Sequence, residues 1–180
     1  MEGKSGKIVD SLPKVSSADR LKQIRRQFVS ERIDAMKPHE HAMELVSQMG
    51  GVSIINNSSS VDIESTWYAM DQIDGKIIWI AGGVDRGNNY NLIKEIVHDK
   101  VTAIIVLGNH NMGIFKFFNQ AGPSLILNAS TIDEALEHSV VIAKRGDTIL
   151  FSPGCPSYDL YENYEQRGSD FKRAVDRLIR

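Results

Sequence analysis

The stretch IIWIAGG at residues 77–83 joins five apolar residues directly to two glycines, and it decides the fold. Similar apolar runs are AIIVL at 103–107, followed by Gly108, and TILF at 148–151. None of these runs alternates apolar with polar residues, which is typical of strands that are buried on both faces. They therefore predict a mainly parallel sheet that is covered by helices on both sides.

The segments between these runs have helical character. We predict a helix that Trp67 and Tyr68 anchor to the sheet, a shorter strand at 125–127, and further helices near 89–98, 111–120, 131–144 and 162–179. Strands and helices that alternate along a chain indicate a doubly wound α/β domain. With the hairpin described next, the sheet is expected to have about six strands.

Residues 42–57 contain a glycine pair between two apolar segments. Gly50 and Gly51 follow the apolar Leu45 and Val46 and precede the run VSII at 52–55. A glycine pair between apolar runs suits a tight β-hairpin. A helix over 40–48 is the alternative that the pattern leaves open.

The first 37 residues differ in character from the rest of the chain. Residues 1–17 carry glycine, proline and serine with little apolar periodicity, so we expect a loose arm. From 18 to 36, apolar residues recur at helical spacing between charged ones, which predicts an amphipathic helix that ends at Lys37-Pro38. The expected division is an N-terminal arm and helix over 1–37 and one globular domain over 38–180.

Composition excludes several classes of function. The chain has 21 Lys and Arg against 23 Asp and Glu, a net charge of -2, so no basic field would attract nucleic acid. No run approaches the ~18 apolar residues of a membrane span, and no signal-peptide core follows the N-terminus, which favours a cytoplasmic protein. Cys155 is the only cysteine, and His39 and His41 have no third ligand at a recognisable spacing, so we expect no metal site.

The turns that follow the predicted strands are where a ligand is expected. In doubly wound sheets, ligands bind beyond the carboxyl ends of the strands, which here means the turns after Asn57, Ala81, Leu107 and Phe151. After Ala81, the glycines would let backbone amides approach an anion, and Arg86 could hold a carboxylate through two parallel hydrogen bonds. The same glycines could also be present only to make a sharp turn.

The turn SPGCPSYD at 152–159 brings hydroxyl, small and carboxylate groups to the same edge. Cys155 has no base beside it in the sequence, so a buried structural thiol is favoured over a nucleophile. Tyr158, Tyr161 and Tyr164 recur every three residues, which would align them along one helical face if the final helix began early, and we expect at least two of them to pack against the sheet. No GxxxxGKS/T loop occurs in the chain, so we expect no nucleotide-phosphate site, and no residue is assigned a catalytic role.

Five blocks of sequence carry a family resemblance. They are INNS at 55–58, STWYA at 65–69, IAGGVDRGN at 80–88, SPGCPSYD at 152–159 and NYEQRG at 163–168. In this order they resemble the C-terminal domain of the D-glutamate-adding enzymes of the Mur ligase family (MurD, UDP-N-acetylmuramoyl-L-alanine:D-glutamate ligase). The resemblance covers about residue 38 to the end of the chain and implies a Rossmann-like domain.

The resemblance also implies an activity and a set of site residues. Members of the family use ATP and magnesium to join an amino acid to a UDP-muramoyl precursor in peptidoglycan synthesis, and the C-terminal domain brings the amino acid. The family's pocket serine, aromatic residue and lysine correspond here to Ser157, Tyr164 and Arg86. At Arg86, the planar guanidinium of arginine replaces the compact ammonium of lysine. Asn57 stands where the family has an acid near the nucleotide ribose, and it is the fourth expected ligand-binding residue.

The chain also departs from the family pattern. A lysine and a threonine that follow the family's acid are replaced here by Ser59 and Val61, and the His-Arg before the first strand is His41-Ala42. Pro156 stands where the family has a small residue. In the family, the residues at these positions contact ATP or D-glutamate, so the resemblance implies that both sets of contacts are altered here.

Three functional hypotheses follow. In the first, the chain does not ligate alone, holds no cofactor of its own, and binds a small carboxylate or a muramoyl peptide. In the second, it is the C-terminal piece of a split ligase that works in trans with separately encoded ligase domains, which hold ATP and magnesium. In the third, it is an interaction module whose N-terminal helix docks on a partner or on a second copy. Neither nucleic acid nor a membrane is expected as a partner.

Overall fold

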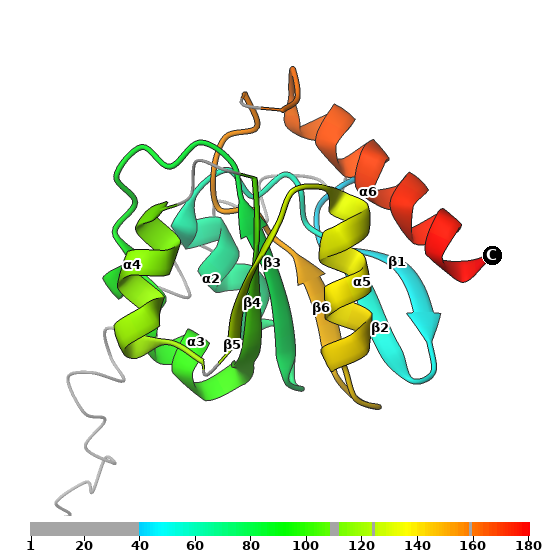
Figure 1. Ribbon diagram of the computed structural model, residues 1–180, viewed down its shortest axis with the longest axis horizontal. Coiled ribbons are helices and arrows are strands. Elements are labelled where there is room, and N and C mark those ends of the chain that lie inside the picture. Colours follow the sequence, from blue (N-terminus) through cyan, green and yellow to red (C-terminus); the bar gives the residue numbers. More distant parts are fainter. Residues whose placement is uncertain (1–39, 109–111, 124, 159) are drawn as a thin grey trace, which may run out of the picture.

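The computed structural model describes residues 40–108, 112–123, 125–158 and 160–180 (Figure 1). The expected arm at 1–17, the expected helix at 18–36 and the boundary at residue 37 lie outside the described residues. In the part of the chain that is described, no helix is both long and apolar enough to cross a membrane.

Within the described residues, six strands form one sheet in the order β1-β2-β6-β3-β4-β5. All neighbouring strands are parallel except β1 and β2. The predicted α/β fold with a mainly parallel sheet of six strands is therefore confirmed. The strands are β1 (Glu44–Met49), β2 (Val52–Asn56), β3 (Ile77–Gly82), β4 (Val101–Leu107), β5 (Leu125–Ala129) and β6 (Thr148–Phe151).

The glycine pair makes the predicted hairpin between β1 and β2. Met49 pairs with Val52, so Gly50 and Gly51 alone form the turn, with φ angles of 60° and 84°. Two-residue hairpin turns in which both residues have positive φ match the twist of the strands and favour glycine. The alternative of a helix over 40–48 is excluded.

Helices cover both faces of the sheet (Figure 1). On β3, Ile77 and Trp79 belong to one core cluster, whereas Ile78 and Ile80 belong to the other. Because successive side chains of a strand point to opposite faces, each face of β3 contributes to a separate core. Helices α2 (Ile63–Asp71), α3 (Lys94–Lys100) and α4 (Met112–Ala121) pack on the first cluster, and α5 (Ile132–Ile142) and α6 (Tyr164–Ile179) on the second.

The helices begin close to the predicted positions. Thr131 accepts a hydrogen bond from the N–H of Glu134 at the start of α5, and Asn163 accepts one from the N–H of Gln166 at the start of α6. Side-chain oxygens at this position satisfy donors that the first helical turn leaves open. The helix predicted near 89–98 is divided into a 3₁₀ turn, η1 (Tyr90–Leu92), and α3.

The prediction for the three tyrosines is wrong in part. Helix α6 begins only at Tyr164, so Tyr158 and Tyr161 precede it and the three side chains share no helical face. Tyr161 packs against the second core cluster, but Tyr158 is 67% exposed. In α2, Trp67 packs against the first cluster as predicted, whereas Tyr68, which was predicted to anchor the same helix, belongs to neither cluster.

Candidate functional site

Three loops meet at the carboxyl edge of the sheet. The β2 loop (57–62), the β3 loop (83–89) and the β6 loop (152–163) each follow a strand of the parallel part of the sheet, and β6 lies between β2 and β3. The carboxyl ends of parallel strands reach the same edge, so these loops are neighbours. In Figure 1 the orange β6 loop rises above the sheet before α6 begins.

The β3 loop, which carries Arg86, has a fixed internal geometry. Asp85 Oδ1 accepts hydrogen bonds from the N–H groups of Gly87 and Asn88 at 2.9 and 3.0 Å. The hydroxyl of Tyr90 donates to Asp85 Oδ2 at 2.8 Å. Burial raises the pKa of Tyr90, so this phenol stays protonated and able to donate at neutral pH. Asp85 thus holds the turn in which Arg86 lies.

Backbone hydrogen bonds join the end of β3 and the β3 loop to the β6 loop. The N–H of Gly82 donates to the carbonyl of Pro153 at 3.1 Å, and the N–H of Val84 donates to the carbonyl of Pro156 at 3.0 Å. Gly83 lies between these two bonds with a φ of 129°, and a Cβ there would be 2.4 Å from the Pro156 carbonyl oxygen. Only glycine allows this close approach of the two loops.

Arg86 and Tyr158 form a second link between these loops. Arg86 is exposed, and its Cζ lies 6.0 Å from the centroid of the Tyr158 ring. A guanidinium above an aromatic face at this distance makes a weak cation–π contact. Because Arg86 faces solvent, a ligand can reach its guanidinium without any rearrangement of the loops.

Ser157 is next to Tyr158 in the chain but is buried, with 3% of its surface exposed. Its backbone carbonyl accepts hydrogen bonds from the N–H groups of Leu160 and Tyr161, at 3.2 and 2.9 Å. These two hydrogen bonds hold the backbone of Ser157 in a turn of the β6 loop.

Asn57 is also buried, and both ends of its amide are engaged within the protein. Oδ1 accepts a hydrogen bond from the N–H of Met43, and Nδ2 donates to Ser152 Oγ, each at 3.1 Å. Ser152 Oγ in turn donates to Thr66 Oγ1 at 3.0 Å. The amide of Asn57 thus connects the β2 loop to the segment before β1 and to the β6 loop, and contact with a ligand would compete with these bonds.

Tyr164 is the first residue of α6 and is half-buried. A hydrogen bond to Glu165, together with partial burial, raises the pKa of Tyr164. Of the four residues predicted from the sequence, Arg86 and Ser157 lie on loops that are bonded to each other. Asn57 lies on the β2 loop, and Tyr164 lies at the start of α6, directly after the β6 loop.

Two residues that join these loops were not singled out from the sequence. Asn88 Nδ2 donates to the carbonyl of Gly154 at 3.0 Å and lies 3.2 Å from Cys155 Sγ, across the β3 and β6 loops. Arg167 in α6 is buried and donates to carbonyls of two loops. Both residues lie inside the blocks quoted above, but nothing in their spacing distinguishes them from exposed polar residues.

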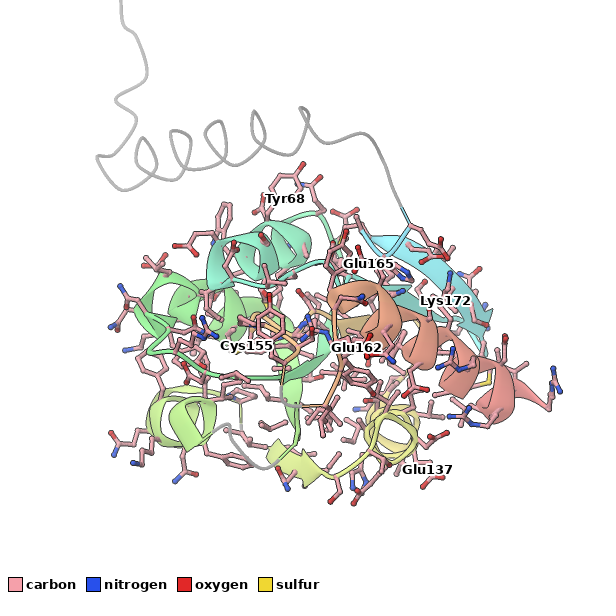
Figure 2. All side chains as sticks on the ribbon, turned by 90° about the horizontal axis from the view of Figure 1, so that it is seen from above. Tyr68, Glu137, Cys155, Glu162, Glu165 and Lys172 are labelled. Carbon is pink, nitrogen blue, oxygen red and sulfur yellow. The ribbon has the colours of Figure 1, made fainter. Side chains whose placement is uncertain are left out.

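Cys155 is fully buried, as predicted for a structural thiol. Figure 2, viewed from above, shows Cys155 near the middle of the molecule, whereas Lys172 lies farther along α6, beside the hairpin. His41 is buried as well, with Nδ1 3.0 Å from Asn56 Nδ2 and 3.8 Å from Glu44 Oε2. Within the described ranges, no group of three or more His, Cys, Asp or Glu side chains could hold a metal ion.

Known proteins are similar to this chain over most of its length. The chain is 36% identical over 163 residues to a UDP-N-acetylmuramoylalanine–D-glutamate ligase of Christiangramia forsetii, a match that covers 91% of this chain and 36% of the relative. It is 38% identical over 152 residues to the ligase of the same name from Porphyromonas gingivalis, covering 84% of this chain and 34% of the relative. No protein-family model matches the chain.

A solved structure supports the fold. MurF ligase from Thermotoga maritima, determined in complex with ADP, aligns with a TM-score of 0.50 at 12% identity, over 90% of this chain and 39% of that one. The chain therefore spans little more than a third of the length of the proteins it matches. In sequence, this chain is a relative of ligases that are named for D-glutamate, and in fold it matches a Mur ligase.

Proposed function

We propose that the chain binds the carboxylate of a small amino acid at the edge where the β3 and β6 loops meet. The observation that carries this proposal is the solvent-facing guanidinium of Arg86, held above Tyr158 on a loop that Asp85 fixes internally. An arginine presented in this way offers two parallel N–H donors to a carboxylate. The relatives are named for D-glutamate, which makes this amino acid the first ligand to test.

The chain on its own is proposed not to catalyse ligation. Forming an acyl phosphate from ATP requires clustered phosphate donors and magnesium to stabilise the developing charge. The sequence contains no GxxxxGKS/T loop. The described residues include no cluster of acidic or histidine ligands for a metal ion. A nucleotide would therefore have to be held by other domains, in the same protein or in trans.

Affinity for a free amino acid is expected to be weak. Arg86 is accessible, but Ser157 is 3% exposed and the amide of Asn57 is engaged internally. Of the predicted residues that the structure describes at this edge, Arg86 is thus the one whose charge a ligand can reach most readily. We expect a dissociation constant on the order of millimolar, equivalent to roughly -4 kcal/mol.

Titration of the protein with D-glutamate, followed by NMR, tests the proposal. We expect saturable shifts of backbone amides in the β3 and β6 loops, and loss of these shifts in Arg86→Ala, because the variant lacks the carboxylate partner. Arg173→Ala removes an exposed arginine from α6 and serves as the matched control.

Shifts that avoid both loops, or that persist unchanged in Arg86→Ala, would show that this edge is not the site. Titration with a muramoyl peptide in parallel separates the candidate ligands. If the chain binds neither and gains activity only when mixed with a ligase that lacks its C-terminal domain, the alternative of a split ligase is favoured.

A further inference from the structure

Arg167 connects loops that are far apart in the sequence. It lies in the first turn of α6 and is 2% exposed. Its Nη1 donates to the carbonyl of Cys155 and its Nη2 to the carbonyl of Ser58, both at 2.9 Å. One guanidinium thus spans the β6 loop and the β2 loop, which the single ammonium of a lysine cannot do in the same geometry.

The surroundings of Arg167 fix its position. A Cβ on the adjacent Gly168 would lie 2.2 Å from Ser58 Oγ and 2.4 Å from His41 Nδ1, so the start of α6 is in close contact with the β2 loop. A Cβ on Gly83 would lie 3.3 Å from Arg167 Nη1, which places the β3 loop against the same guanidinium. The side chain of Arg167 therefore lies where all three loops converge.

The two hydrogen bonds of Arg167 are costly to break. If either loop moved away, a buried carbonyl oxygen or a buried guanidinium N–H would lose its partner, and such groups carry a large desolvation penalty. The β2 and β6 loops are consequently held in one arrangement. The β6 loop carries Ser157 and Tyr158, and Val84 and Asn88 attach it to the loop of Arg86.

We propose that Arg167 is the positioning residue of the carboxylate site. By holding the β2 and β6 loops through its two hydrogen bonds, it sets the position of Ser157 and Tyr158 relative to Arg86. The ligand in this inference rests on the proposed function, whereas the effect of Arg167 on the loops is measured without any ligand.

Cys155 provides the local probe. It is the only cysteine of the chain, it is fully buried, and its own carbonyl accepts the hydrogen bond from Arg167 Nη1. The rate at which a thiol reagent such as DTNB labels Cys155 therefore reports how often the β6 loop opens. In Arg167→Lys, which keeps the charge but loses the fork, we expect labelling to be roughly tenfold faster and affinity for D-glutamate roughly tenfold lower.

Two controls separate positioning from general stability. Arg173→Lys alters an arginine of the same helix that is exposed, and it should change neither rate nor affinity. Opening of one loop exposes little surface, so labelling of Arg167→Lys should depend only weakly on urea below its unfolding transition. If labelling is as slow as in the wild type, or rises only in step with global unfolding measured by circular dichroism, Arg167 does not position the loops.

The outcomes also distinguish this inference from the proposed function. If the wild type binds no D-glutamate and Arg167→Lys still accelerates labelling, the carboxylate ligand is wrong and the effect of Arg167 on the loops stands. If Arg167→Lys does not fold, hydrogen exchange in the wild type decides. The guanidinium protons of Arg167 should exchange much more slowly than those of Arg173, and equal rates would overturn the inference.

Discussion

Lys100 shows how much one side chain can hold in place. It is the last residue of α3, and its Nζ donates to the carbonyls of Met70, Asp71 and Ile73, at 3.0, 3.1 and 2.5 Å, where α2 ends. The last carbonyls of a helix have no donor within the helix, and a cation there is also favoured by the helix dipole.

Replacement of Lys100 should therefore weaken the end of α2. We expect Lys100→Met to lower the free energy of unfolding, measured by urea denaturation, by about 1–2 kcal/mol. Lys94→Met, an exposed change in the same helix, should stay within roughly 0.5 kcal/mol of the wild type. A loss no larger than that of Lys94→Met would mean that water replaces the ammonium without cost.

A single substitution at Val61 tests whether D-glutamate binds near the β2 loop. Val61 lies in the β2 loop, is 41% exposed, and stands where the D-glutamate-adding enzymes carry a threonine in the resemblance described above. Val61→Thr adds a hydroxyl of nearly the same shape, which should donate one hydrogen bond to the ligand carboxylate. We expect roughly tenfold tighter binding of D-glutamate by NMR titration.

The control for this change is Val141→Thr, because Val141 lies on α5 and is 87% exposed. It should leave the affinity for D-glutamate unchanged. An unchanged affinity in Val61→Thr would place the ligand away from the β2 loop, even if Arg86 proves essential.

Between elements, charge pairs hold the hairpin against α6. Lys172 donates to Glu40 Oε1 and to Glu44 Oε1. The hydrogen bond from Lys172 lowers the pKa of Glu40. Burial opposes the shift of Glu44, but hydrogen bonds from the His41 N–H, Lys172 and Asn56 outweigh it and lower its pKa. The hydrogen bond to Glu40, with support from Glu44, raises the pKa of Lys172.

These shifts predict how stability depends on pH. Carboxyl groups with a lowered folded pKa stabilise the fold above their unfolded pKa of about 4.3, and this contribution is lost as pH falls through the lower folded values. The raised pKa of Lys172 affects stability at high pH. Its contribution is complete below about pH 10.4 and is lost as pH rises through the folded value.

Lys172→Met should therefore destabilise the protein at pH 7, and the difference from the wild type should shrink as pH falls below about 4. Urea denaturation at pH 7, 4 and 3 measures this difference. Lys116→Met, which removes an exposed charge on α4, should follow the wild-type pH profile in parallel. A difference for Lys172→Met that stays constant down to pH 3 would show that Glu40 and Glu44 do not act through this lysine.

Most elements could be predicted because their causes are local. Buried parallel strands require unbroken apolar runs such as 103–107, and a two-residue turn with positive φ requires residues such as Gly50 and Gly51. The start of α6 was predicted near residue 162, close to its observed start at Tyr164. Asn163, whose side chain caps the helix, sets this start.

The candidate site was predicted less completely because it depends on contacts between distant residues. Arg86 could be placed from the strand and turn before it. The burial of Ser157 and Asn57 could not, because residues remote in sequence cover them. An arginine in the first turn of an amphipathic helix is usually exposed, so the burial of Arg167 was also unforeseen.

At the scale of the whole molecule, the strand order means that the candidate site forms only when β6 lies between β2 and β3. β6 pairs with β2 on one side and with β3 on the other, although both precede it by many residues. The β6 loop contacts the β2 and β3 loops only after β6 has paired with these two strands. Local periodicity carries no information on such pairing, which is why the strand order was not among the sequence predictions.

This order has a consequence for the chain as it leaves the ribosome. Until residues 148–151 have emerged, the β1-β2 hairpin and the β3-β4-β5 unit are two separate pieces, and β2 and β3 each present an unpaired edge. Unpaired edges of apolar strands readily join other chains. The nascent polypeptide therefore passes through an aggregation-prone interval that ends only when its last strand closes the gap, and chaperones that shield strand edges should matter most for this protein during that interval.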